Sequence, residues 1–230
     1  YDSGRPNDAP TWVGNFRFQA SKKAKSAIFD ALCHDRRCAL CHDRLDNFKF
    51  AEHEKEAVEK EARLGYDGRF GPGLPQISDG QLLFMLNGVK KLKEGSGRMA
   101  IIQNGSSLFT GDAGSGPSEI RKYLIEQDLV EAIIQLPTDL FYNTGIATYI
   151  WVVSKDKPSY RLGKVQLIDA SKCFVKRRKN IGNKRVDLDD SCIEMIVQAY
   201  NECKDELYEK DNLAVESKVF GIGVESYTVG

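Results

Sequence analysis

Three short apolar runs constrain the fold of this chain more than any other feature. They span residues 99–102, 129–136 and 148–153, and the third is β-branched and aromatic almost throughout. Runs of this length and composition, each ended by turn residues, are typical of strands buried on both faces. We therefore expect these segments to form the centre of a covered sheet.

A helix is predicted between the first two runs. It begins at Pro117, with Gly116 as its N-cap. Its inward stripe consists of Ile120, Tyr123, Leu124 and Gln127. A strand, a helix and a second strand form a parallel pair through a right-handed crossover, which indicates half of an open α/β sheet.

Further elements are expected on both sides of this region. Residues 1–20 are predicted to be an irregular loop and 21–64 to be largely helical, followed by a Gly/Pro loop at 65–76. Additional elements are a helix at 79–94, a strand at 164–169, an amphipathic helix at 189–204 and a final hairpin or linker strand at 219–229.

Composition limits the classes of protein to which the chain can belong. Of its 230 residues, 41% are apolar, enough for a sizeable core, and 33 basic residues balance 33 acidic ones. No global field therefore draws the chain to nucleic acid or to a membrane. No apolar run approaches the roughly 18 residues of a membrane-spanning helix. Six cysteines without a secretory signal favour reduced thiols, so we expect a cytoplasmic protein.

Several motifs follow one another in a characteristic order. The segments are 65–75, 78–84, 105–111, 120–126, 131–137, 140–148 and 163–171. This order closely resembles the modification subunit of type I restriction-modification systems, a family of adenine-N6 DNA methyltransferases. The resemblance covers about two thirds of the chain.

The resemblance implies a fold and a set of partners. The fold is the C-terminal half of a Rossmann-like, S-adenosylmethionine-dependent methyltransferase sheet, with the family's strands 5, 7 and 6 at 98–103, 147–154 and 129–136. Strand 7 is expected to be antiparallel and to lie between the other two. The cofactor would be S-adenosylmethionine. The partners would be DNA, a specificity subunit and a restriction subunit that is a helicase and nuclease.

The same resemblance divides the chain into three parts. Residues 1–64 would be a loop and helical insertion, 65–157 the second half of the methyltransferase domain, and 158–230 a C-terminal extension. Without an N-terminal half, the edge of the family's strand 5 would be bare. We therefore expect either self-association of the chain or an edge covered by residues 1–64.

The family's catalytic turn, Asn/Asp-Pro-Pro-aromatic, would place its aromatic residue at Tyr1. An ordinary loop tyrosine is the alternative. The chain contains neither a Pro-Pro pair nor the Phe-x-Gly-x-Gly turn that holds the cofactor. We therefore expect a fragment that binds S-adenosylmethionine weakly and does not methylate by itself. A non-catalytic DNA- or partner-binding module derived from this family is the alternative function.

Family positions also suggest cofactor and base contacts. Asp79 and Phe84 would face the cofactor, although Phe84 also fits the core stripe of its helix. Asn104 leaves its strand at the ligand-binding end of an open sheet.

The loop after strand 6 would present an aromatic ring to an adenine that has left the duplex. Phe141 is the first choice and Tyr142 the second, with Gly145 allowing close approach. The alternative is a purely structural turn.

A basic run at 176–185 is a candidate for contact with DNA phosphates, and a solvated loop is the alternative. Its basic residues are Lys176, Arg177, Arg178, Lys179, Lys184 and Arg185.

A Cys/His cluster lies at 33–42. Zinc could be bound by Cys33, Cys38, Cys41 and a histidine such as His42, which would suggest a small zinc-dependent protein. The spacing lacks a second paired knuckle, and the alternative is cysteines used as small apolar residues.

Overall fold

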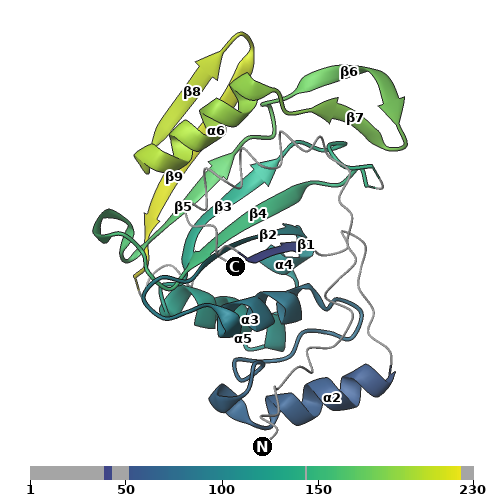
Figure 1. Cartoon of the computed structure of the whole chain (residues 1–230), viewed down its shortest axis with the longest axis vertical. Helices are drawn as coiled ribbons and strands as arrows, with labels where there is room; N and C mark the ends of the chain where they lie inside the picture. The colour runs from purple at the N-terminus through teal and green to yellow at the C-terminus, as the bar shows by residue number, and fades with distance from the viewer. Residues whose placement is uncertain (1–38, 43–51, 143, 224–230) are drawn as a thin grey trace, which may run out of the picture.

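The computed structural model describes residues 39–42, 52–142 and 144–223 (Figure 1). Its main feature is a mixed seven-stranded sheet with the order β1-β2-β4-β3-β5-β9-β8. In that order the strands are Ala39–His42, Arg98–Asn104, Thr148–Ser154, Val130–Leu136, Lys164–Asp169, Leu213–Gly221 and Glu206–Lys210. A separate two-stranded hairpin is formed by β6 (Val175–Ile181) and β7 (Lys184–Asp187).

The three central strands are those expected from the apolar runs. β4 pairs antiparallel with β2 on one side and with β3 on the other, so the inserted antiparallel strand is confirmed. β5, predicted at the same residues, adds parallel to β3. Because both sheet faces are covered here, consecutive residues of β4 alternate between two cores while nearly all remain buried.

The edge of β2 is covered by β1. This four-residue strand runs parallel to β2, with Ala39 opposite Met99 and His42 opposite Ile102. Of the two expectations for this edge, self-association or cover by residues 1–64, the structure therefore shows the cover. A strand at 39–42 also departs from the helical expectation for 21–64, whereas α2 (Glu52–Ala62) agrees with it.

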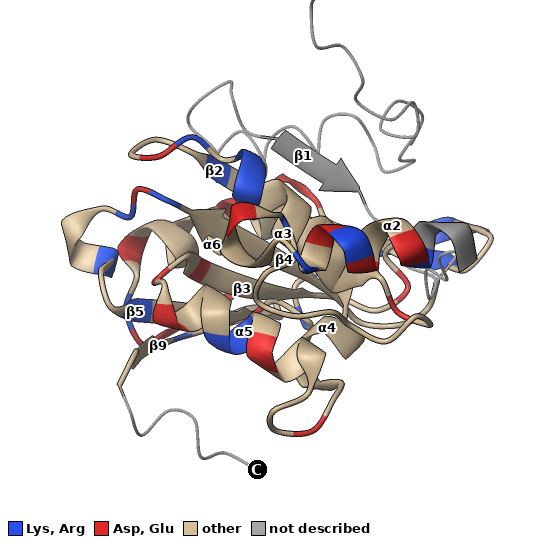
Figure 2. Cartoon of the chain, turned by 90° about the horizontal axis from the view of Figure 1, so that it is seen from below, with Lys and Arg blue, Asp and Glu red and all other residues tan. Residues whose placement is uncertain are grey.

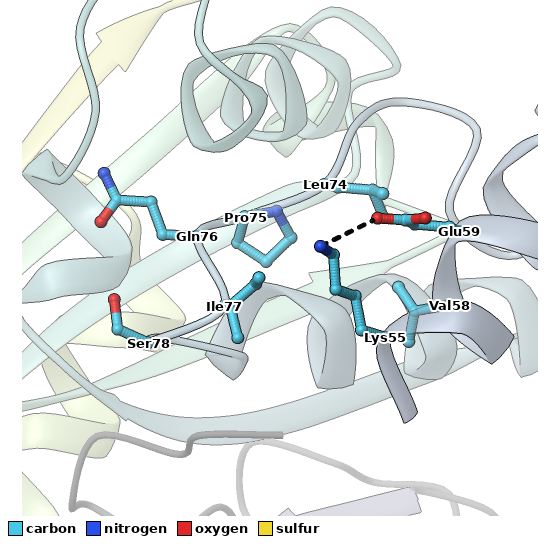
Figure 3. Close-up of a pocket in the computed structure, with 8 residues that line it drawn as sticks. All are labelled: Lys55, Val58, Glu59, Leu74, Pro75, Gln76, Ile77 and Ser78. Atoms are coloured by element: carbon cyan, nitrogen blue, oxygen red, sulfur yellow. Dashed lines mark ion pairs between the residues drawn. The ribbon is translucent and has the colours of Figure 1, made fainter. Parts of the chain in front are cut away.

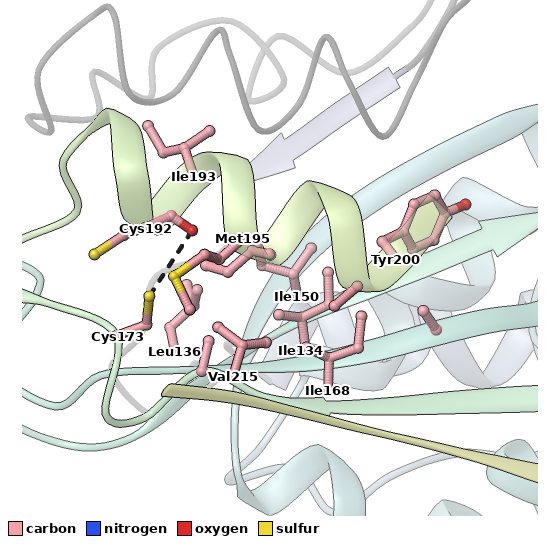
Figure 4. Packing of buried hydrophobic residues seen from close by; sticks show 14 of the residues in the cluster. Ile134, Leu136, Ile150, Ile168, Cys173, Cys192, Ile193, Met195, Tyr200 and Val215 are labelled. Atoms are coloured by element: carbon pink, nitrogen blue, oxygen red, sulfur yellow. Dashed lines mark hydrogen bonds between the residues drawn. The ribbon is translucent and has the colours of Figure 1, made fainter. Parts of the chain in front are cut away.

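Helices cover both faces of the sheet. α3 (Gln81–Lys91) and α5 (Gly116–Glu126) pack on one face, where Met85, Leu86, Ile120 and Leu124 are fully or almost fully buried. On the opposite face, α6 (Asp190–Glu202) packs against β3, β4, β5 and β9 (Figures 1 and 4). Short elements are α4 (Ser106–Phe109), η2 (Gly65–Asp67) and η3 (Ser159–Arg161).

The start of α5 differs by one residue from the prediction. Ser115 is the N-cap, and Gly116 is already helical. A side chain at Gly116 would overlap the carbonyl oxygen of Leu74, so the absence of a Cβ lets the helix start approach the Gly/Pro loop. Of the predicted inward stripe, Ile120 and Leu124 are buried. Tyr123 is half-buried and Gln127 is exposed.

The C-terminal region contains more strand than expected. α6 is capped as its sequence predicts, because the Asp189 carboxylate accepts a hydrogen bond from the backbone N–H of Cys192 at 2.8 Å. The sequence predicts a final hairpin or linker strand at 219–229. The structure has an antiparallel hairpin of β8 and β9 that starts earlier, over 206–221, and residues 224–229 lie outside the described residues.

A buried polar cluster ties α6 to the sheet. At a β-bulge in β3, Glu131 points its carboxylate to the guanidinium of Arg98 and to the hydroxyl of Tyr200, which also accepts a hydrogen bond from Arg98. Arg161 is 1% exposed, donates to the Tyr200 carbonyl and to Gln166 Oε1, and lies over the Tyr200 ring at 4.1 Å. Arg98 and Glu131 thus form a buried ion pair, whereas the buried guanidinium of Arg161 is held by neutral oxygens and by the Tyr200 ring.

Charged residues of both signs are interspersed on the helical side of the molecule (Figure 2). This distribution agrees with the zero formal net charge. Within the residues that the structure describes, no helix has the length and apolar character needed to span a membrane.

Candidate functional site

One edge of the sheet brings together most of the predicted site residues. Asn104 at the end of β2 lies opposite Thr148 of β4, and Thr148 lies opposite Leu136 at the end of β3. β2 and β3 are both antiparallel to β4, so their carboxyl ends meet at this edge, where open α/β sheets bind ligands. With about 4.8 Å between neighbouring strands, the two ends are about 10 Å apart.

A polar network occupies the β2 end of this edge. Gln81, the first residue of α3, donates from Nε2 to Asn104 Oδ1 at 2.8 Å and to Asp79 Oδ1 at 3.0 Å. In return, Gln81 Oε1 accepts from the Asn104 backbone N–H at 2.8 Å. The single hydroxyl hydrogen of Ser106 is shared between Asn104 Oδ1, at 2.6 Å, and the Asp79 carboxylate. The network fixes the start of α3 against the end of β2.

Asp79, predicted to face the cofactor, and Asn104, predicted to bind the target base, therefore belong to one hydrogen-bonded cluster. Sequence reasoning missed Gln81 and Ser106, which complete it. For Gln81, the sequence offered one signal, since this polar residue directly precedes the apolar stripe of α3. The structure buries Gln81 fully. Phe84 lies one helical turn beyond Gln81, is half-buried and packs against the core beneath α3.

The β3–β4 loop forms the other half of the edge. Its two adjacent aromatic residues point in opposite directions: Phe141 is 8% exposed and belongs to the core under α6, whereas Tyr142 is 46% exposed. Phe141 also forms a bridge to Thr144. Asp139 has a positive φ of 57°, and a Cβ at Gly145 would lie 2.8 Å from its Oδ1. The loop is thus tightly folded, and of its two rings Tyr142 is the accessible one.

The basic run forms a solvent-exposed β-hairpin, and this hairpin lies on the aromatic loop. The Asn183 backbone N–H donates to the Tyr142 carbonyl at 3.0 Å, and that of Arg185 donates to the Asp139 carbonyl at 2.9 Å. The hairpin turn contains Gly182 at φ 59°.

The six basic residues of the hairpin fall into two groups. Lys184 is 5% exposed and pairs with Asp187 at 2.7 Å, and Arg177 pairs with the same carboxylate. These two cations hold the hairpin together. The other four are exposed and form no ion pair within the described residues; they are Lys176, Arg178, Lys179 and Arg185.

Several residues of the predicted catalytic and zinc sites have no described side chain. Tyr1, Cys33 and Cys38 lie outside the described residues, and Cys41 and His42 are described only as backbone positions of β1. Among the described side chains, no group of three or more metal-binding residues is present. Zinc binding at 33–42 remains a prediction that metal analysis of the chain would test.

A hollow of about 730 Å³ lies between α2 and the segment 74–78 (Figure 3). Its two charged residues, Lys55 and Glu59, pair with each other at 3.7 Å. Ser78 forms its end and directly precedes Asp79. The remaining lining is apolar or uncharged.

Relatives with known names share parts of this chain. It is 36% identical over 108 residues to the type I restriction enzyme MjaVIII methylase subunit of Methanocaldococcus jannaschii, a match covering 47% of this chain and 18% of that protein. It is 35% identical over 153 residues to the MpnII methylase subunit of Mycoplasma pneumoniae, covering 65% and 26%.

A solved structure shares the fold. The type I restriction-modification methyltransferase subunit of Streptococcus thermophilus superposes with a TM-score of 0.60 at 29% identity, covering 78% of this chain and 34% of that one. The chain thus matches about a third or less of the length of each of these relatives. The sequence also matches the N-6 DNA methylase family over residues 44–221, about three quarters of the chain. The chain therefore belongs to the N-6 DNA methylase family.

Proposed function

We propose that this chain is part of the modification subunit of a type I restriction-modification system. The parent subunit transfers a methyl group from S-adenosylmethionine to the N6 atom of an adenine in DNA. It works in the cytoplasm with a specificity subunit and with a restriction subunit that is a helicase and nuclease. The names of the relatives support this assignment.

The observation that carries the proposal is the single edge described above. The polar network at the end of β2, the exposed ring of Tyr142 and the basic hairpin all lie there, and the hairpin is hydrogen-bonded to the Tyr142 loop. An enzyme that modifies a base within DNA needs a cofactor side, a face for the extruded base and contacts to the backbone. The grouping of the network, the ring and the hairpin at one edge supports the proposal.

S-adenosylmethionine supplies the methyl group when bound. The chain's residues fit one side of such a ligand, because Phe84 is only half-buried on the helix that starts at the network. Both carboxylate oxygens of Asp79 already accept hydrogen bonds, and the Asn104 side-chain oxygen is engaged by Gln81 and Ser106. We therefore assign to Asp79 and Asn104 a structural role, which is to hold the start of α3 against the end of β2. We assign contact with the cofactor to Phe84.

Tyr142 is the residue on which we expect the extruded adenine to stack. Aromatic stacking contributes on the order of 1–3 kcal/mol per base, which corresponds to about tenfold to a hundredfold in affinity. In the assembled methylase, Tyr142→Ala should lower methyl transfer by that factor and leave cofactor affinity and melting temperature unchanged. Full activity of this variant would refute the assignment.

The exposed cations of the hairpin are expected to contact phosphates. Each phosphate contact steepens the dependence of log affinity on log salt by about 0.9. Replacing Lys176, Arg178 and Lys179 with Gln should therefore flatten that slope by up to about 3 units, measured by fluorescence anisotropy with duplex DNA.

The matched control removes the same charge elsewhere. Lys60, Lys91 and Lys93 are exposed residues of α2 and of α3 and the turn that follows it, on the side of the sheet away from the hairpin. Their replacement with Gln should change the slope much less. Equal slopes for the two triple variants would show that the hairpin makes no specific contribution.

The alternative is a DNA- or partner-binding module without catalysis. It is supported by the lack of a Phe-x-Gly-x-Gly turn and a Pro-Pro pair in the chain. For the same reason we expect the chain alone not to methylate. Salt-dependent DNA binding through the hairpin, with no methyl transfer by the assembled complex, would favour this alternative.

A further inference from the structure

We propose that the turn of the β6–β7 hairpin is a positioning element for the Tyr142 ring, with Gly182 as its essential residue. This proposal rests on the proposed function of Tyr142. It joins two features that would otherwise act separately, namely phosphate contact by the hairpin and base stacking by the loop.

The contact between turn and ring is close. A Cβ built on Gly182 would lie 2.8 Å from the Tyr142 carbonyl oxygen, and 3.0 and 3.2 Å from its ring carbons Cε2 and Cδ2. The edge of the ring therefore rests on the bare Cα of Gly182. Because Tyr142 is still 46% exposed, this support leaves much of the residue accessible to a ligand.

The hairpin has no other link to the main sheet through strand pairing, since β6 and β7 form their own two-stranded sheet. It is joined to the loop by backbone hydrogen bonds. Asn183 donates to the carbonyl of Tyr142 at 3.0 Å, and Arg185 and Val186 donate to that of Asp139 at 2.9 and 3.4 Å. Three backbone hydrogen bonds therefore hold the turn against the loop.

A second anchor fixes the loop from below. Phe141 is buried in the core, so the adjacent Tyr142 emerges on the opposite side of the backbone. With the core holding one side and the turn holding the other, the ring has little rotational freedom. A stacking face that is already ordered loses less conformational entropy when a base arrives.

The experiment separates packing from backbone strain. Asn tolerates a positive φ better than other side chains but carries a Cβ. Gly182→Asn therefore introduces the overlap with Tyr142 at a small conformational cost. Gly95→Asn is the matched control, because Gly95 has a φ of 68° and its Cβ would meet nothing within 4 Å.

In the assembled methylase, both variants should melt within a few degrees of the parent. Gly182→Asn should lower kcat about tenfold or more, approaching the loss of Tyr142→Ala, with the KM for S-adenosylmethionine unchanged. Gly95→Asn should keep full kcat. Combining Gly182→Asn with Tyr142→Ala should add almost nothing to the single Tyr142 loss, because no ring remains to be positioned.

The outcomes are distinguishable. If Tyr142→Ala has no effect, the proposed function of the loop fails. If Tyr142→Ala lowers kcat but Gly182→Asn does not, or if the two losses multiply, the positioning role is refuted while the stacking role stands. A rise in the KM for DNA alone would show that the turn serves only phosphate binding.

Discussion

The buried hydroxyl of Tyr200 provides a quantitative test of what holds α6 on the sheet. Tyr200→Phe removes the hydrogen bond to the Glu131 carboxylate and the one accepted from Arg98. The Glu131 side chain has no exposed surface, so water cannot replace the lost donor. Removing a hydrogen bond to a buried charged group costs about 1.5–3 kcal/mol. Because Arg98 still pairs with Glu131, we expect a loss of about 2–3 kcal/mol in the free energy of unfolding.

The matched control is the same substitution at the surface. The Tyr208 hydroxyl also donates to a carboxylate, that of Glu202, at 2.8 Å, but this pair is exposed to solvent. Urea unfolding and thermal melting would be measured for both variants. For a chain of this size, 1 kcal/mol corresponds to about 2–4 °C, so Tyr200→Phe should melt about 4–12 °C lower. Tyr208→Phe should melt close to the parent.

The same residue predicts a pH dependence. Burial, followed by the negative charge of Glu131, raises the pKa of Tyr200 far above its ordinary value. In the unfolded chain this hydroxyl ionises near pH 10. The stability it contributes is therefore fully present below about pH 10 and falls as the pH rises above that value. Tyr200→Phe should remove this part of the alkaline decline. Equal stability of the two proteins at pH 8, or identical declines up to pH 11, would refute the reasoning.

Three further predictions concern packing and the cofactor. Phe141→Ala should cost about 3–5 kcal/mol of stability in thermal melts, since the ring is 8% exposed; an unchanged melting temperature would show that the ring is not core. Gly116→Ala should destabilise the chain because its Cβ overlaps the Leu74 carbonyl, whereas Gly221→Ala, with open space around it, should not. The 230-residue chain should bind S-adenosylmethionine weakly in calorimetric titrations, and micromolar binding would contradict this.

The centre of the fold was predictable because its strands are buried on both faces. β2, β3 and β4 lie within about a residue of the expected bounds, since short apolar runs rich in β-branched and aromatic residues and ended by turn residues favour strands covered on both faces. The strands that escaped prediction lack that signal. β6 is mostly basic, and three of the five residues of β8, Glu206–Lys210, are charged, so neither shows clean alternation.

The site was predictable in part for the same physical reason. Asn104 follows directly from its place at the end of an apolar strand. Its partner Gln81 is 23 residues away in the sequence, and only the fold brings the two amides to 2.8 Å. The choice between Phe141 and Tyr142 depended on the direction of a single residue in a tight loop. That direction follows from the turn at Asp139 and from the bridge at Thr144, neither of which periodicity can reveal.

The placement of the hairpin explains why a small appendage can hold a ring precisely. β6 begins two residues after Cys173, which is fully buried and directs its Sγ to the Cys192 carbonyl on α6 at 3.9 Å (Figure 4). β7 ends two residues before the Asp189 cap of the same helix. Both ends of the hairpin are therefore attached to the base of α6, and its turn is attached to Tyr142. Since the far end of α6 is held by Tyr200, its attachment to the sheet stabilises the frame from which the turn supports the ring. Tyr200→Phe should consequently cost stability, yet leave kcat intact at temperatures where the protein remains folded, because the hydrogen bonds between the turn and the loop do not involve the Tyr200 hydroxyl.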